Sequence, residues 1–184
     1  MMMTVGDSVP SGEPRANPYV ASDVEAILVE RGWLDISLRC EAQEWITLAV
    51  RLLGPHASDR AALGELVSLC FEYDARSILS AAATHAVLAR EGAREVIRAL
   101  ALETIAAEPV DSDRFRMIVE AIKARVPYRS RLLFHPIRLT LTGRAGEGEL
   151  DRVILLLDAA AHTLGLAPVK TVRRRILEFC STLD

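Results

Sequence analysis

Apolar residues recur at helical spacing along most of the chain, beginning just after Ser22. Ser22 and Glu25 have the spacing of a capping box, in which each side chain accepts a hydrogen bond from the other residue's backbone N–H. Gly32 is typical of the residue just past the end of a helix. We therefore expect a first helix between about residues 22 and 32. Its inward positions are Val24, Ile27 and Leu28.

Glycine and proline divide the next part of the chain into further helices. Pro cannot continue a helix, and Gly commonly follows its last residue, so Gly54-Pro55, Gly92 and Pro109 mark helix ends. The second helix is expected to begin near Asp35 or Ser37 and to stop at Gly54-Pro55. The next three are expected over about residues 58–73, 75–90 and 94–107.

The clearest helical pattern begins at Asp111 or Ser112 and ends at Pro127. Its apolar positions lie on one helix face and are Phe115, Ile118, Val119, Ile122 and Val126. Two more helices follow, one from Leu150 and one from about Pro168. Their expected inward residues are Leu150, Val153, Ile154 and Leu157 for the first, and Val172, Ile176, Phe179 and Leu183 for the second.

Residues 131–142 are the one stretch that also allows a strand, because Thr140 and Thr142 alternate with Leu. A single strand would have no partner elsewhere in the chain. Pro136 suits the first position of a helix and Gly143 the residue after its end, so we expect a short helix over residues 136–142. The predicted fold is all-α, a bundle of about eight helices in two packed subdomains. The expected divisions are a mobile leader over 1–19 and subdomains over 20–92 and 93–184.

Composition agrees with a folded domain of ordinary core size. The chain has 184 residues, of which 51% are hydrophobic and only 5% aromatic, so aliphatic side chains must build the core. Cys40, Cys70 and Cys180 are far apart, which argues against a disulfide framework and a zinc site. We expect all three to pack as small apolar side chains in a reducing cytoplasm. No apolar run is long enough to predict a membrane span, and no signal peptide is evident.

The net charge of −3 hides an asymmetry between the two parts of the chain. Residues 1–110 carry 9 Lys and Arg against 16 Asp and Glu, whereas residues 111–184 carry 13 against 9. Ordinary solvated surface explains such a difference, but a basic C-terminal part is also typical of a protein with an anionic partner.

Motifs for catalysis and nucleotide binding are absent from the sequence. We find no P-loop, GxGxxG, HExxH or GxSxG pattern, and the four histidines have no ligand-like spacing. We therefore expect no cofactor, no metal and no enzymatic activity from this chain alone.

One stretch, LLFHPIRLTLTGRAGEGELDRVILLL, carries a family resemblance. It is similar to the C-terminal anticodon-binding region of bacterial-type glutamyl-tRNA synthetases, which shows Pro, Leu-Arg, a closing Thr-Gly, a short loop and a Leu that opens a helix. The corresponding residues are Pro136, Arg138, Thr142, Gly143 and Leu150. Residues 94–125 are also similar, and residues 22–90 resemble the preceding helices of that region in pattern.

The resemblance implies an α-helical cage that binds tRNA for Glu at its anticodon, where unpaired bases are open to recognition. By position it nominates Arg138 and Leu150, with Arg144 and Glu147 in the loop between them. An Arg can stack on a base or hydrogen-bond a phosphate in a fork. Further candidates are basic residues flanking the motif or in the tail, namely Arg131, Arg173 and Arg174.

Departures from the family pattern set the limits of this expectation. The motifs of a synthetase catalytic domain are missing, so aminoacylation would need a separate catalytic chain. The family's Gly-Lys before the motif is Ser130-Arg131 here, and Gly148 replaces the usual loop Pro. Glu147 places a negative charge where RNA phosphates would be repelled.

Two interpretations of the site therefore stay open. Arg138 either ties helix ends together or contacts tRNA, and Arg173 to Arg175 form either a solvated helix face or a phosphate-contacting patch. Leu150 is expected in the core rather than against a base. The predicted function is a tRNA-binding module, standalone or split from its catalytic part. The alternative is a helical protein-interaction module that kept the fold and lost RNA binding. An α-solenoid ranks lower, because no repeat consensus is present.

Overall fold

A computed structural model describes residues 16–106 and 108–183. In this part the chain is all-α, as predicted, and the only extended pairing is an isolated antiparallel bridge between Leu34 and Leu166. Two short 3-10 helices span Ile36–Leu38 and Gly54–His56. The α-helices are α1 Ala21–Glu30, α2 Gln43–Leu53, α3 Arg60–Phe71, α4 Ala75–Ser80, α5 Ala82–Leu88, α6 Ala93–Thr104, α7 Ser112–Arg125, α8 Ser130–Thr142, α9 Glu149–Ala161 and α10 Val172–Leu183.

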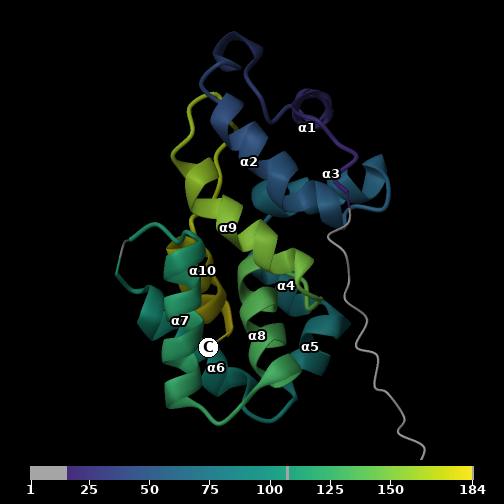
Figure 1. Cartoon of the computed structure of the whole chain (residues 1–184). Coiled ribbons are helices and arrows are strands. Elements are labelled where there is room, and N and C mark those ends of the chain that lie inside the picture. Colours follow the sequence, from purple (N-terminus) through teal and green to yellow (C-terminus); the bar gives the residue numbers. More distant parts are fainter. Residues whose placement is uncertain (1–15, 107, 184) are drawn as a thin grey trace, which may run out of the picture.

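Helix α9 crosses the middle of the molecule and connects its two ends (Figure 1). It packs on α2 and α3 at one end of the molecule and on α8 at the other end of the molecule. The end of the molecule that contains α8 also contains α6, and α7, α8 and α10 pack around α6. Helices α4 and α5 pack on α10 and α8, although they precede residue 92 in the chain. The division into subdomains at residue 92 stays a prediction.

The N-cap of the first helix lies two residues earlier than its sequence pattern indicates. Val20 is the N-cap, and its backbone N–H donates to the carboxylate of Asp23 at 2.8 Å. The predicted capping partner of Ser22, Glu25, instead forms an ion pair with Arg39 at 3.6 Å. The capping box was therefore assigned to the wrong residues, because Asp23 is the acidic side chain placed three residues after the actual cap.

Three other helix boundaries differ from expectation. Only a 3-10 turn follows Asp35, whose side chain accepts from the Ser37 backbone N–H, and α2 begins at Gln43. The helix expected over 75–90 is broken at Ala81, where the backbone is extended, so α4 and α5 are separate. The prediction that Pro136 opens a helix was wrong, since α8 begins at Ser130 and contains Pro136 in its interior.

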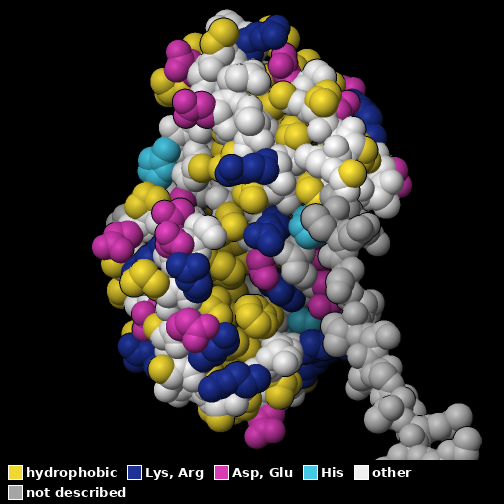
Figure 2. All heavy atoms as spheres, in the orientation of Figure 1, with side chains coloured by type: hydrophobic (Ala, Val, Ile, Leu, Met, Phe, Trp, Pro, Cys, Tyr) yellow, Lys and Arg dark blue, Asp and Glu magenta, His cyan; other side chains and the backbone are white. Residues whose placement is uncertain are grey.

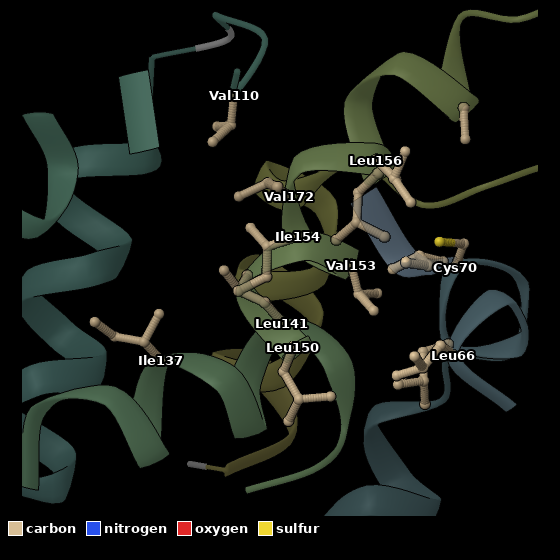
Figure 3. Close-up of a cluster of buried hydrophobic side chains, with 14 of the residues drawn as sticks. Leu66, Cys70, Val110, Ile137, Leu141, Leu150, Val153, Ile154, Leu156 and Val172 are labelled. Atoms are coloured by element: carbon tan, nitrogen blue, oxygen red, sulfur yellow. The ribbon is translucent and has the colours of Figure 1, made fainter. Parts of the chain in front are cut away.

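The core consists of aliphatic side chains from both ends of the molecule. Leu150, Val153, Ile154 and Leu156 of α9 point between α3, α8 and α10 (Figure 3), and all four are buried. Most predicted inward positions of α7 and α10 are also correct, since Ile118, Val119, Ile122, Val126, Val172, Ile176 and Phe179 are buried. The other two, Phe115 and Leu183, are half-buried against the core.

The cysteines and the N-terminal leader differ in part from the sequence-based expectation. Cys70 is buried and Cys180 half-buried, but Cys40 is exposed, so it does not pack as a core side chain. Residues 1–15 of the expected leader lie outside the described residues. Residues 16–19, the described part of the leader, contact the helices. The Asn17 side-chain amide donates to the Val50 carbonyl at 2.9 Å, and Tyr19 packs against the core.

Candidate nucleic-acid interface

Helix α8 carries three basic or imidazole side chains on one face. Arg131, His135 and Arg138 follow at intervals of four and three residues, which places them above one another along a helix. The loop after α8 and the first turn of α9 lie against this face. Gly143, with φ of +79°, ends α8 in the left-handed conformation that glycine adopts without strain.

Arg138 is almost fully buried and is bonded within the chain. Its Nε and Nη2 donate to the two carboxylate oxygens of Asp151 at 2.7 and 2.8 Å, and its Nη1 donates to the Gly146 carbonyl at 2.7 Å. The guanidinium also lies 5.0 Å from the ring centroid of Phe134. This two-pronged pairing ties α8 to α9 and fixes the loop between them.

Leu150 has the environment that the sequence indicated. It lies in the first turn of α9, is 3% exposed, and points into the core beside Leu141 (Figure 3). In this position it holds α9 against α8 and offers no apolar surface to a ligand.

Arg131 in the first turn of α8 and Arg144 in the loop after α8 are exposed, and each is paired with a carboxylate. Arg131 donates to Glu147 at 3.3 Å, and Arg144 donates to Glu65 of α3 at 3.1 Å. All four side chains are at least half exposed, so water screens these pairs and a competing anion can replace them. Figure 2 shows the resulting mixture of positive and negative side chains over this part of the molecule.

Arg173 and Arg174 lie in the first turn of α10 and point to solvent. Among the described residues neither has an ion-pair partner. Arg173 lines a small surface pocket of about 160 Å³ together with Asp158 and His162 at the C-terminal end of α9. The basic candidates therefore form two groups at opposite ends of α9, with Arg131, Arg138 and Arg144 near its beginning.

The third arginine of the tail, Arg175, is fully buried. Burial lowers the pKa of its guanidinium to about 10, which still leaves it charged at neutral pH. Its three nitrogens donate to four backbone carbonyls, those of Leu69, Cys70, Leu141 and Lys170. Consecutive residues point about 100° apart on a helix, so the three arginines do not share one face, and Arg175 is the one that turns inward.

Arg90 and His135 form a contact that sequence reasoning missed. Arg90 comes from the turn after α5, and its Nη1 lies 2.9 Å from Nδ1 of His135. Burial, followed by the charge of Arg90, lowers the pKa of the His135 imidazole below its usual value. The spacing of His135 from Arg131 and Arg138 was a signal available in the sequence, whereas the approach of Arg90 depends on the tertiary fold.

Two absences concern residues 16–106 and 108–183. No cluster of three or more His, Cys, Asp or Glu side chains there has an arrangement that would hold a metal ion. None of the helices in that part is both long and apolar enough to cross a membrane.

Sequence comparison finds curated relatives in Bacillus. The chain is 28% identical over 134 residues to a glutamate–tRNA ligase of Bacillus subtilis, and 27% and 28% identical over 130 residues to those of Bacillus velezensis and Bacillus licheniformis. Each match covers 71% of this chain but only 26% of the ligase. No protein-family model and no solved structure matches the chain.

The chain thus spans about a quarter of the length of the ligases that it matches. That share, together with the all-α structure, is consistent with a C-terminal region of the synthetase without its catalytic domain. The resemblance indicated by the motif around Arg138 is confirmed, and the chain is similar to a part of glutamate–tRNA ligase.

Proposed function

We propose that this chain is a tRNA-binding module related to glutamate–tRNA ligase. The observation that carries the proposal is the similarity over 71% of the chain to ligases whose substrate is a tRNA. The proposed ligand is tRNA for Glu, bound at its anticodon end, and the proposed role is tRNA recognition or a contribution to glutamyl-tRNA aminoacylation. In this proposal the rest of a synthetase supplies the catalytic step, because the match covers only a quarter of the ligase.

The proposed contacts use the exposed cations. Arg131 and Arg144 border the loop between α8 and α9, and Arg173 and Arg174 extend the basic surface at the other end of α9. Such side chains contact phosphates, which fixes the position of an RNA without reading its sequence. Glu147, in the same loop, opposes these contacts by its charge.

Arg138 has a positioning role in this proposal. Direct contact with a base would require it to release Asp151 and Gly146, to which all three guanidinium nitrogens donate. By holding Gly146 and Asp151, Arg138 fixes the loop that carries Arg144 and Glu147. A direct contact between Arg138 and RNA stays a prediction.

Binding is tested by fluorescence anisotropy of labelled tRNA for Glu, a non-cognate tRNA and an unrelated RNA hairpin. Replacing Arg173 and Arg174 together by Ala should weaken binding and reduce the salt slope by about 2, because about one counterion is released per phosphate contact. Arg51→Ala is the matched control, since Arg51 is an exposed helical arginine without an ion pair among the described residues. Absence of binding to any RNA at low salt would refute the proposal.

A second candidate function is a helical protein-interaction module that has lost RNA binding. The observation that favours it is that Arg131, Arg138 and Arg144 are each paired with a carboxylate of the chain itself. Three internal acids thus occupy the positions that RNA phosphates would take. Co-purification with a stable protein partner, without RNA, would favour this function over tRNA binding.

A further inference from the structure

We infer that Arg90, Arg131 and His135 form a binding site for a phosphate group, with Glu147 as an internal competitor. As the contact point of an RNA phosphate, the site rests on the proposed function. As an anion site, it rests on the geometry of α8 and the α5–α6 turn alone.

The proton on His135 is located by its partner. Arg is only a hydrogen-bond donor, so at 2.9 Å Nη1 of Arg90 donates and Nδ1 of His135 accepts. The imidazole is then neutral, with its proton on Nε2. That Nε2–H is buried and has no hydrogen-bond partner among the described residues. A buried donor without an acceptor is costly, so an acceptor at this position would stabilise the structure.

The charges around His135 favour an anionic acceptor. The charged groups that act on the imidazole are Arg90, Arg131, Arg138 and a single acid, Glu147. Arg90 contacts no carboxylate among the described residues. Asp151 offsets the charge of Arg138 and Glu147 offsets that of Arg131, so Arg90 leaves the site with a net positive charge. Such a site suits an ion with several acceptor oxygens.

A phosphate can enter the site only by replacing Glu147 as the partner of Arg131. Arg138 is held by both oxygens of Asp151 and is 9% exposed, so it stays in place. The Arg131–Glu147 pair is longer, at 3.3 Å, and its side chains are 75% and 67% exposed. Arg131 lies one helical turn before His135. A phosphate that replaces Glu147 on Arg131 thus brings acceptor oxygens to the vicinity of Nε2 and of Arg90.

The inference predicts opposite effects for neighbouring residues. Arg90→Ala and Arg131→Ala should each weaken phosphate binding about tenfold, because each removes a charge-assisted hydrogen bond. Glu147→Gln removes the competing carboxylate with little change in shape and should strengthen binding. Arg51→Ala, an exposed arginine on α2, should leave binding unchanged.

The first test uses inorganic phosphate as the probe. The ring signals of His135 are followed by NMR during a phosphate titration, and they are assigned by their loss in His135→Gln. We expect a saturable shift of these signals. The phosphate affinity that the titration gives should be lower in Arg90→Ala and higher in Glu147→Gln. If the His135 signals do not respond to phosphate, or respond equally in all variants, the site does not exist.

The second test uses labelled tRNA for Glu with the same variants, and it separates this inference from the proposed function. Loss of about one unit of salt slope in Arg90→Ala supports an RNA phosphate at the site. Unchanged tRNA binding in Arg90→Ala overturns that assignment and leaves tRNA binding intact. If phosphate binds at His135 but no tRNA binds at all, the proposed function fails and the anion site stands.

Discussion

A two-pronged ion pair joins Arg138 of α8 to Asp151 of α9, and both side chains are mostly shielded from water. The same guanidinium holds the Gly146 carbonyl, so one side chain of α8 holds both the loop and the first turn of α9. Removing one partner of a shielded pair leaves the other charge without compensation, which costs more than losing the pair as a whole. The sequence motif around Arg138 therefore has a structural role that does not depend on any ligand.

Replacing Arg138 by Ala is expected to lower the free energy of unfolding by about 3 kcal/mol. Urea denaturation measures the change, and a double-mutant cycle with Asp151→Ala isolates the pair. Arg144→Ala is the control, because the Arg144–Glu65 pair is exposed and its loss should cost about 0.5 kcal/mol or less. Equal effects of the two substitutions would contradict a structural role for Arg138.

Arg175 is a second buried guanidinium, and it joins three helices through backbone carbonyls. Its donors reach the ends of α3 and α8 from α10, and it lies 4.5 Å from the ring centroid of Tyr73. The hydroxyl of Tyr73 donates to the Thr140 carbonyl at 2.6 Å, which adds another tie at the same place. A planar group with five N–H donors is suited to such a cluster of acceptors.

Lysine cannot reproduce this arrangement, because its single ammonium cannot reach carbonyls on several helix ends. Arg175→Lys should therefore lower the free energy of unfolding by about 2–4 kcal/mol. Arg174→Lys, on the exposed side of the same helix turn, should change it by about 0.5 kcal/mol or less. Chemical denaturation of both variants tests this, and a neutral Arg175→Lys would disprove the assigned role.

At the scale of elements, helices with a clean apolar face were the most predictable. The pattern of α7 predicted nearly the observed bounds and that of α9 nearly the observed start, because most of their apolar positions coincide with the buried ones. The break between α4 and α5 has no Gly or Pro to mark it, and Ala81 becomes extended only in the tertiary context. Pro136 was predicted to begin a helix because proline favours the first helical position. Burial of α8 on several helices outweighs the backbone hydrogen bond that Pro136 cannot donate.

The site was less predictable than the fold. Helical spacing places Arg131, His135 and Arg138 on one face, but the carboxylates that pair with the arginines come from α9, its preceding loop and α3. Such pairs join residues up to 79 positions apart, so no local pattern contains them. Whether a candidate arginine is exposed for a ligand or bonded internally is decided by these tertiary contacts.

The beginning of α8 allows a test of backbone strain. Ser130 has φ of +50°, in the left-handed region that residues with a Cβ disfavour and glycine adopts easily. Ser130→Gly should raise the free energy of unfolding by about 0.5–1 kcal/mol by removing this strain. Ser112→Gly, at the ordinary beginning of α7, should instead lower it. Thermal denaturation compares the two, and destabilisation by Ser130→Gly would contradict the strain.

In the whole molecule, α9 joins the helices at the two ends into one hydrophobic core. It contacts α2 and α3 on one side and α8 and α10 on the other, so its loss would separate the helices at the two ends (Figure 1). Asp158 of α9 adds a polar tie, because its carboxylate oxygens accept from the backbone N–H groups of Val110 and Val172 at 2.7 and 2.8 Å. The loop before α7 and the start of α10 are both anchored in this way.

The buried core also predicts how stability depends on alkaline pH. Burial raises the pKa of the Cys70 thiol from 9.0 to about 12, and burial also raises the pKa of Tyr73. Above pH 9 the unfolded chain loses the Cys70 proton while the folded chain keeps it, so the folded state is progressively disfavoured. The free energy of unfolding should fall by up to about 1.4 kcal/mol per pH unit for this thiol.

Urea denaturation between pH 8 and 10 measures that slope. Cys70→Ala removes the titrating thiol, so it should reduce the pH dependence in this range even though its cavity lowers stability at every pH. Cys40→Ala is the matched control, because Cys40 is exposed. If Cys70→Ala and the unmodified chain have parallel pH profiles, burial of the thiol does not contribute to the slope.

We propose that this helical domain binds tRNA through its exposed cations while Arg138 supports the fold. The most direct test is the anisotropy titration of labelled tRNA for Glu against a non-cognate tRNA, at low and near-physiological salt. We expect binding to tRNA for Glu that weakens with salt, falls in the Arg173→Ala, Arg174→Ala variant and is unchanged in Arg51→Ala. A chain that is folded but binds none of the RNAs at low salt would contradict it.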